Sequence, residues 1–137
     1  MRHLVIRMLL LVLISFSSTL VYSNTSEIFY TVHGKKVAFI EDQEKRLLIS
    51  KNCQKAAHFY SCDAFNALKK ASARNMNYAL GGGKNPGAIE CLSFRGAKTL
   101  VGLDSSGNEW SLCAFEDGSL IDSGSLDYYG EKHDLRH

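Results

Sequence analysis

The chain has 137 residues, of which 22% are charged and 45% hydrophobic, and its formal net charge is +2. Residues 1–23 contain Arg2 and Arg7 and no acidic residue, so the rest of the chain carries 14 basic and 14 acidic side chains. A neutral chain lacks the basic surface that binds nucleic acid or an anionic membrane, so we expect no nucleic acid partner.

Residues 1–23 have the organisation of a secretory signal peptide. A positively charged start precedes the apolar segment MLLLVLISF, and Val21 and Ser23 occupy the −3 and −1 positions of a cleavage site. The apolar segment is shorter than the roughly 20 residues of a bilayer span. We therefore predict cleavage near Ser23, no stable membrane anchor, and a periplasmic or secreted protein. An uncleaved signal anchor is the alternative.

The region after the leader begins with a sequence typical of strands. Residues 27–50 are rich in β-branched and aromatic side chains and are interrupted at His33-Gly34 and again at 41–45. This pattern predicts two or three antiparallel strands joined by tight turns.

Residues 51–76 change to an alanine-rich composition with apolar side chains at helical spacing. We expect helix here, with Asp63 as the N-cap of a helix that runs to about Asn75. Residues 24–80 are thus predicted to form an N-terminal region of strands and helix. Three consecutive glycines follow, and we interpret residues 81–84 as a linker.

The segment 85–130 predicts a helix followed by an antiparallel β-meander. Asn85 is a typical N-cap, Pro86 suits the first helical position, and Gly96 follows the expected end at Arg95. Strand-forming residues then alternate with turn residues, which predicts strands at 98–103, at 109–115 and from 119 to 122. Residues 131–137 are expected to be a polar tail. The predicted fold class is α+β.

Four cysteines in a small exported chain favour two disulfides over free thiols. Cys53 and Cys62 lie in one helix-like segment, whereas Cys91 and Cys113 belong to the C-terminal segment, so we predict the pairs 53–62 and 91–113. Zinc binding or thiol catalysis with His58 is disfavoured, because the spacing is not Cys-x-x-Cys and export favours oxidation.

Other motifs with chemical meaning are weak. The run GGGKNPG lacks the Lys-Ser/Thr end of a phosphate loop, the run DSSGNE has its glycine at the wrong place for a calcium loop, and no Gly-x-Ser-x-Gly is present. Turns and solvated strand faces explain the carboxylates without a catalytic pair. We assign no catalytic residue, no cofactor and no metal ligand.

Three aromatic residues are candidates for a contact surface. Tyr128 and Tyr129 are adjacent, so in an extended segment their side chains point to opposite faces and one of them is exposed. Together with Trp110, that exposed tyrosine is the first place to expect a partner.

The C-terminal segment also resembles a known family. The residues that carry this resemblance are Asn85-Pro86, Ala88, Cys91, Gly96, Gly107, Cys113, Asp117-Gly118, Ile121-Asp122 and Leu126. In this set, residues 85–130 resemble a family of small exported bacterial proteins of unknown function that carries a haemolysin label. The chain departs from the family pattern at Gly87, where alanine is usual, and at Ser123-Gly124, where an acidic residue and tryptophan are common.

These observations predict an exported, non-catalytic binding or structural module of the bacterial cell envelope, whose partner is an unknown protein or envelope component. One alternative is an inhibitor of a hydrolase such as a lysozyme or a protease, because a rigid disulfide-bonded loop suits pre-organised inhibition. A second alternative, implied by the family label, is a membrane-damaging factor. The neutral chain, with no long apolar stretch after residue 23, disfavours it.

Overall fold

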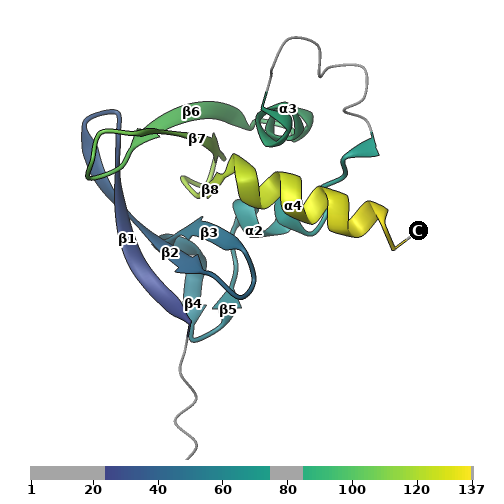
Figure 1. Ribbon diagram of the computed structural model, residues 1–137, viewed down its shortest axis with the longest axis horizontal. Coiled ribbons are helices and arrows are strands. Elements are labelled where there is room, and N and C mark those ends of the chain that lie inside the picture. The colour runs from purple at the N-terminus through teal and green to yellow at the C-terminus, as the bar shows by residue number, and fades with distance from the viewer. Residues whose placement is uncertain (1–23, 75–84, 137) are drawn as a thin grey trace, which may run out of the picture.

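The computed structural model describes residues 24–74 and 85–136 (Figure 1). Within these residues, six antiparallel strands form a closed barrel in the order β1-β2-β3-β8-β7-β6. The barrel strands are β1 (Thr25–Val32), β2 (Lys35–Asp42), β3 (Leu47–Ser50), β6 (Lys98–Leu103), β7 (Glu109–Ala114) and β8 (Leu120–Asp122). The leader and the glycine linker lie outside the described residues.

The remaining elements gather on one side of the barrel, where Figure 1 shows the three helices together. A short 3-10 turn, η1 (Lys51–Cys53), leads into a small hairpin of β4 (Gln54–Ala56) and β5 (Phe59–Tyr60). The helices are α2 (Asp63–Leu68), α3 (Pro86–Ser93) and α4 (Ser123–Asp134).

The mixed α+β class is confirmed, but the prediction of a separate β-meander is wrong. Strands β6, β7 and β8 do follow one another as antiparallel neighbours. The sheet continues on both sides, because β8 pairs with β3 at Ile121 and Ile49, and β6 pairs with β1 at Leu103 and Thr31. Strands from both halves of the chain therefore build one barrel.

The helix expected across residues 51–76 is mostly replaced by other structure. Residues 51–60 form η1 and the β4–β5 hairpin, whose turn places His58 at a φ of 60°. Only α2 is helical, and its N-cap is Cys62, whose Sγ accepts from the Phe65 N–H, in place of the predicted Asp63. Apolar spacing did not distinguish a hairpin from a helix here, because in the hairpin Tyr60 is buried while Phe59 is exposed.

The expectation of an extended segment around Tyr128 is also wrong, since Ser123 to Asp134 is helix α4. The Asp122 carboxylate caps this helix by accepting from the backbone N–H groups of Gly124 and Ser125. The sequence Asp-Ser-Gly-Ser resembles turn chemistry, and an N-cap uses the same short polar side chains.

Two apolar clusters sit on the two faces of the barrel wall. Successive strand residues point to opposite faces, so Phe39 lies in the interior cluster and Ile40 in the cluster beneath the helices. The interior cluster consists of Tyr30, Val32, Phe39, Leu48, Leu112, Ala114 and Leu120. The cluster on the helical side consists of Ile40, Leu47, Ile49, Cys53, Tyr60, Ala64, Leu68, Ala71, Cys91, Cys113, Ile121 and Leu126.

Both predicted disulfides are confirmed, and both lie in the cluster on the helical side. Cys53 bonds Cys62 across 9 positions, and Cys91 of α3 bonds Cys113 of β7 across 22 positions. Closing a loop of that second length contributes on the order of 3 kcal/mol in the chain-entropy treatment. The bond thereby attaches α3 to the wall of the barrel.

The predicted start of α3 is confirmed, and its glycine has a structural reason. Asn85 accepts from the Ala88 N–H at 3.1 Å, and Pro86 takes the first position. A Cβ placed on Gly87 would lie 1.7 Å from the backbone oxygen of Ser123. The two helix starts therefore touch backbone to backbone, and this contact requires glycine at position 87.

We predict that Gly87→Ala lowers the free energy of unfolding by about 2 kcal/mol, the size of an overpacking penalty. Alanine is the better helix former, so the sign opposes what helix propensity alone gives. Chemical denaturation of the variant and of Leu92→Ala, at an exposed position of the same helix, measures the difference. Equal stability of Gly87→Ala and the parent would show that α3 and α4 do not meet in this way.

Candidate functional site

Strands β1 and β6 close the barrel, but they pair over only a short part of their length. Strand β1 pairs with β2 along all of Thr25–Val32, but it pairs with β6 only through Thr31 and Val32. The earlier part of β1 therefore diverges from β6 and leaves the barrel open at that end. We call this opening the barrel mouth and define it by Tyr30, Glu41, Asp104, Trp110 and Asp122.

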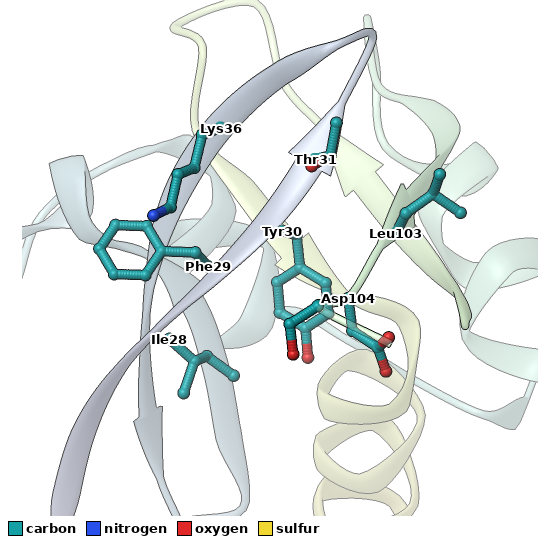
Figure 2. A pocket seen from close by; sticks show the side chains of 8 residues that line it. Ile28, Phe29, Tyr30, Thr31, Lys36, Leu103 and Asp104 are labelled. Atoms are coloured by element: carbon teal, nitrogen blue, oxygen red, sulfur yellow. The ribbon is translucent and has the colours of Figure 1, made fainter. Parts of the chain in front are cut away.

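Two cavities adjoin the barrel mouth. The first, of about 510 Å³, lies between β1 and the end of β6 and includes Tyr30 and Asp104 (Figure 2). The second, of about 480 Å³, includes Glu41, Trp110 and Asp122. Both volumes fall in the range of small-molecule and side-chain binding pockets.

Tyr30 lies between these cavities and carries the aromatic wall of the mouth. Its side chain is 3% exposed, and its ring contacts the Trp110 ring edge-on at a centroid distance of 5.6 Å. On the opposite face of β1, Lys36 Nζ lies 4.2 Å from the centre of the Phe29 ring, and Figure 2 shows this pair pointing away from Tyr30.

The electrostatic field in the mouth is negative. Burial and then, in decreasing order, the charges of Asp122, Glu41 and Asp104 together raise the pKa of Tyr30 to about 12. All three charged groups that act on the Tyr30 hydroxyl are carboxylates, although they come from three different parts of the chain. The mouth therefore combines aromatic faces with convergent negative charge.

Asp104 organises the loop at the rim of the mouth. Its carboxylate accepts from the Asn108 side chain and backbone, from the Ser106 N–H, and from the indole N–H of Trp110 at 3.2 Å. These hydrogen bonds, with the Asn108 side chain contributing most, lower the pKa of Asp104 to about 2. Gly107 adopts a φ of 82° within the turn. Asp104 thus stays ionised and fixes the orientation of Trp110.

Asp122 lies deeper in the mouth, at the point where β8 becomes α4. Its side chain is 8% exposed, and burial raises its pKa, while hydrogen bonds from Ser125 and Gly124 act in the opposite direction. Ser125 Oγ donates to the carboxylate and accepts from the Leu48 N–H at 2.9 Å. Asp122 therefore joins β8, α4 and β3 and also contributes charge to the mouth.

The three aromatic residues predicted as a contact surface divide between two places. Trp110 is 40% exposed, and it lines the second mouth cavity together with Tyr128. Tyr129 faces a different cavity on the helical side, and its hydroxyl donates to the Lys45 carbonyl at 3.0 Å. Helix α4 therefore directs the two adjacent tyrosine side chains into different cavities, whereas an extended segment would direct them to opposite faces of a sheet.

Sequence reasoning missed Tyr30, Asp104 and Asp122 as a group. Alternation in the run IFYTV indicates that Tyr30 points inward, but only the closure of the barrel places it opposite Trp110. Among residues 24–74 and 85–136, no group of three or more His, Cys, Asp or Glu side chains has the arrangement of a metal site.

No family model, curated protein or solved structure matches this chain. The family resemblance of residues 85–130 therefore stays a prediction from their motifs. No helix in the described part of the chain has the length and hydropathy of a membrane span.

The raised pKa of Tyr30 predicts a pH dependence. Because its pKa is about 12 in the folded protein and 10.0 for an unperturbed tyrosine, its contribution to stability is complete below pH 10 and is lost as the pH rises through 12. Burial also raises the pKa of Tyr60 and Tyr129, so Tyr30→Phe should reduce the amplitude of the late step in an absorbance titration of tyrosinate by one tyrosine. Glu41→Gln should move the Tyr30 part of this step to lower pH, because it removes one negative charge. An unchanged amplitude of the late step in Tyr30→Phe would contradict the assignment.

Proposed function

We propose that the protein is an exported, non-catalytic binding module, and that its partner is a protein or envelope component that inserts a cationic side chain into the barrel mouth. The observation that carries this proposal is the Tyr30–Trp110 pair surrounded by Glu41, Asp104 and Asp122. Aromatic faces and carboxylates together attract guanidinium and ammonium groups.

Export is supported by the two disulfides, which are typical of oxidising compartments. The sequence of residues 1–23 adds the features of a cleavable leader. Together they support a periplasmic or secreted location.

Binding without catalysis is supported by the state of the carboxylates. Asp104 accepts four hydrogen bonds from its own loop and from Trp110, and Asp122 is engaged by the start of α4. Both carboxylates are thus held in position, and Asp104, whose pKa is lowered, keeps its charge, which suits electrostatic recognition. A general acid or base needs instead a proton that it exchanges with substrate.

The protein's own cationic side chains near the mouth lie over the ring of Tyr128 and leave the ring of Trp110 to a partner. Arg46 lies over the Tyr128 ring, with its guanidinium carbon 5.0 Å from the ring centre, and Lys132 lies 5.6 Å from the same ring. Tyr128 is therefore already covered by the protein's own cations. The exposed Trp110 has no cation over its ring among the described residues, and this ring is the proposed contact.

We expect an arginine-containing peptide to change the fluorescence of Trp110, which is the single tryptophan of the chain. A saturable change with an Ac-Gly-Arg-Gly-amide peptide should weaken several-fold when salt is raised, because exposed charge pairs are screened. Asp104→Asn should reduce the affinity roughly tenfold, the effect of a charge-assisted hydrogen bond or ion pair at a partly buried site.

The matched control peptide replaces arginine by citrulline, which keeps the shape and removes the charge. Leu92→Ala is the control variant, since Leu92 is exposed on α3 and lines neither cavity at the mouth. Equal binding of both peptides would refute recognition of a cation at the mouth. Capture of partners from envelope extract by the parent and by Asp104→Asn then identifies the natural partner.

One observation favours inhibition of a hydrolase as the specific form of binding. The loop from Asp104 to Asn108 is held by hydrogen bonds of 2.8 to 3.0 Å to one carboxylate and to its own backbone, so its conformation is set before any partner arrives. Pre-organisation of this kind lowers the entropic cost of binding. If the proposal holds, the protein should slow a lysozyme or a serine protease in a rate assay, and Asp104→Asn should abolish this effect. Unchanged rates across a panel of such hydrolases would remove inhibition as the form of binding.

A further inference from the structure

A separate cavity of about 250 Å³ lies on the helical side of the barrel. It is enclosed by the β2–β3 turn, the β4–β5 hairpin, α2 and the later part of α4, and it shares only Leu47 with the cavities at the barrel mouth. We call it the Tyr60 cavity. Its volume is below that of most pockets for drug-sized ligands, so it suits a single ring or a short branched chain.

The walls of the Tyr60 cavity are largely apolar. Leu47 and Leu68 are each 2% exposed, and the Phe65 ring lies 5.5 Å from the Tyr60 ring, measured between centres. These side chains belong to the apolar cluster on the helical side, which the Cys53–Cys62 disulfide helps to fix. The cavity is therefore bounded by rigid parts of the fold.

A single buried polar group faces these apolar walls. The Tyr60 side chain is 5% exposed, and its hydroxyl oxygen is buried without a hydrogen-bond partner among the described residues. Buried hydroxyl groups in folded proteins almost always have a partner, from the protein, from water or from a ligand. Tyr60 thus marks the position at which a polar atom of a ligand would be accommodated.

The charges around the Tyr60 cavity are mainly positive. Lys45, Lys69, His58 and His133 line it, and none of its described lining residues is acidic. Burial and the charge of Asp42 raise the pKa of the Tyr60 hydroxyl, while Lys45, which is paired with Asp42 at 3.2 Å, acts in the opposite direction. Lys69 Nζ lies 4.7 Å from the centre of the Phe65 ring and forms no ion pair with a described residue, so its charge is available to a ligand.

His133 is oriented by the backbone of the segment after α2. Its Nδ1 lies 3.0 Å from the Ala71 carbonyl oxygen. Because a carbonyl only accepts, Nδ1 carries the proton and donates, which leaves Nε2 as the other ring position.

We propose that the Tyr60 cavity binds a small carboxylate with an apolar body. The apolar body packs against Leu47, Leu68 and Phe65, and the carboxylate accepts the Tyr60 O–H at the positively charged side of the cavity. This site is independent of the proposed function of the barrel mouth. The carboxylate belongs either to a free acid or to the C-terminus of a peptide, since both present the same group.

Titration of the purified protein with benzoate, followed by amide chemical shifts and calorimetry, tests the proposal. Benzoate should bind saturably, and benzamide, which has the same shape without the charge, should bind at least roughly tenfold more weakly. Tyr60→Phe should weaken benzoate binding by roughly tenfold, and Lys69→Met should weaken it several-fold. N-acetylphenylalanine and its amide then distinguish a free acid from a peptide end: stronger binding than benzoate indicates a peptide end, and weaker binding a free acid.

Two control variants are available in the same part of the chain. Lys70→Met removes the neighbouring positive charge, but Lys70 lines a different surface with Asp63 and Phe94. Phe59→Leu changes the residue beside Tyr60; the Phe59 side chain is 59% exposed. Neither should alter benzoate binding, and Trp110→Ala at the barrel mouth should not alter it either. Equal affinities for benzoate and benzamide, unchanged binding in Tyr60→Phe, or no binding of either compound would overturn the proposal.

Discussion

The rest of the structure depends on the hydrogen bonds that the Asp122 carboxylate accepts. This carboxylate ends β8 inside the barrel, caps α4 on the outside, and reaches β3 through Ser125, whose Oγ accepts from the Leu48 N–H. Helix α4 consequently starts at the barrel wall and crosses the helical side in one fixed direction. The barrel mouth lies on one side of this helix start, and the Tyr60 cavity lies farther along the same helix. A single buried carboxylate thus fixes the positions of both cavities relative to each other.

Local sequence signals predicted the elements that are specified locally. The Asn85-Pro86 start of α3 and the strands around residues 98–103, 109–115 and 120–122 follow from capping and turn residues that act over a few positions. The disulfide pairs were also accessible, because each joins cysteines of one region. The closure of the barrel was not, since the β1–β6 and β3–β8 pairings bring together residues about seventy positions apart and leave no local mark in the sequence.

The residues of the candidate site divide in the same way, into those that local sequence signals reveal and those that only the closed barrel brings together. Trp110 and Tyr128 were recognised from their residue types, and they meet at one cavity. Tyr30 and Asp122 carry much of the electrostatic character of the mouth, but the sequence alone offers Tyr30 only as one aromatic residue of a strand and Asp122 as part of a solvated strand face. The helix α4 was missed because its cap resembles a turn, and with it the direction of Tyr129 towards the Tyr60 cavity.

The closure of the barrel also has a consequence for how the chain folds. The first three strands form hairpins with near neighbours, but β1 and β3 find their second partners only in β6 and β8. Contacts between such distant positions make folding slow, because the entropy of closing a long loop is lost before the contact forms. During synthesis from the N-terminus, β1 and β3 would each have one edge without a partner strand until the last third of the chain had been made. The barrel can therefore close only after β6 and β8 have been made.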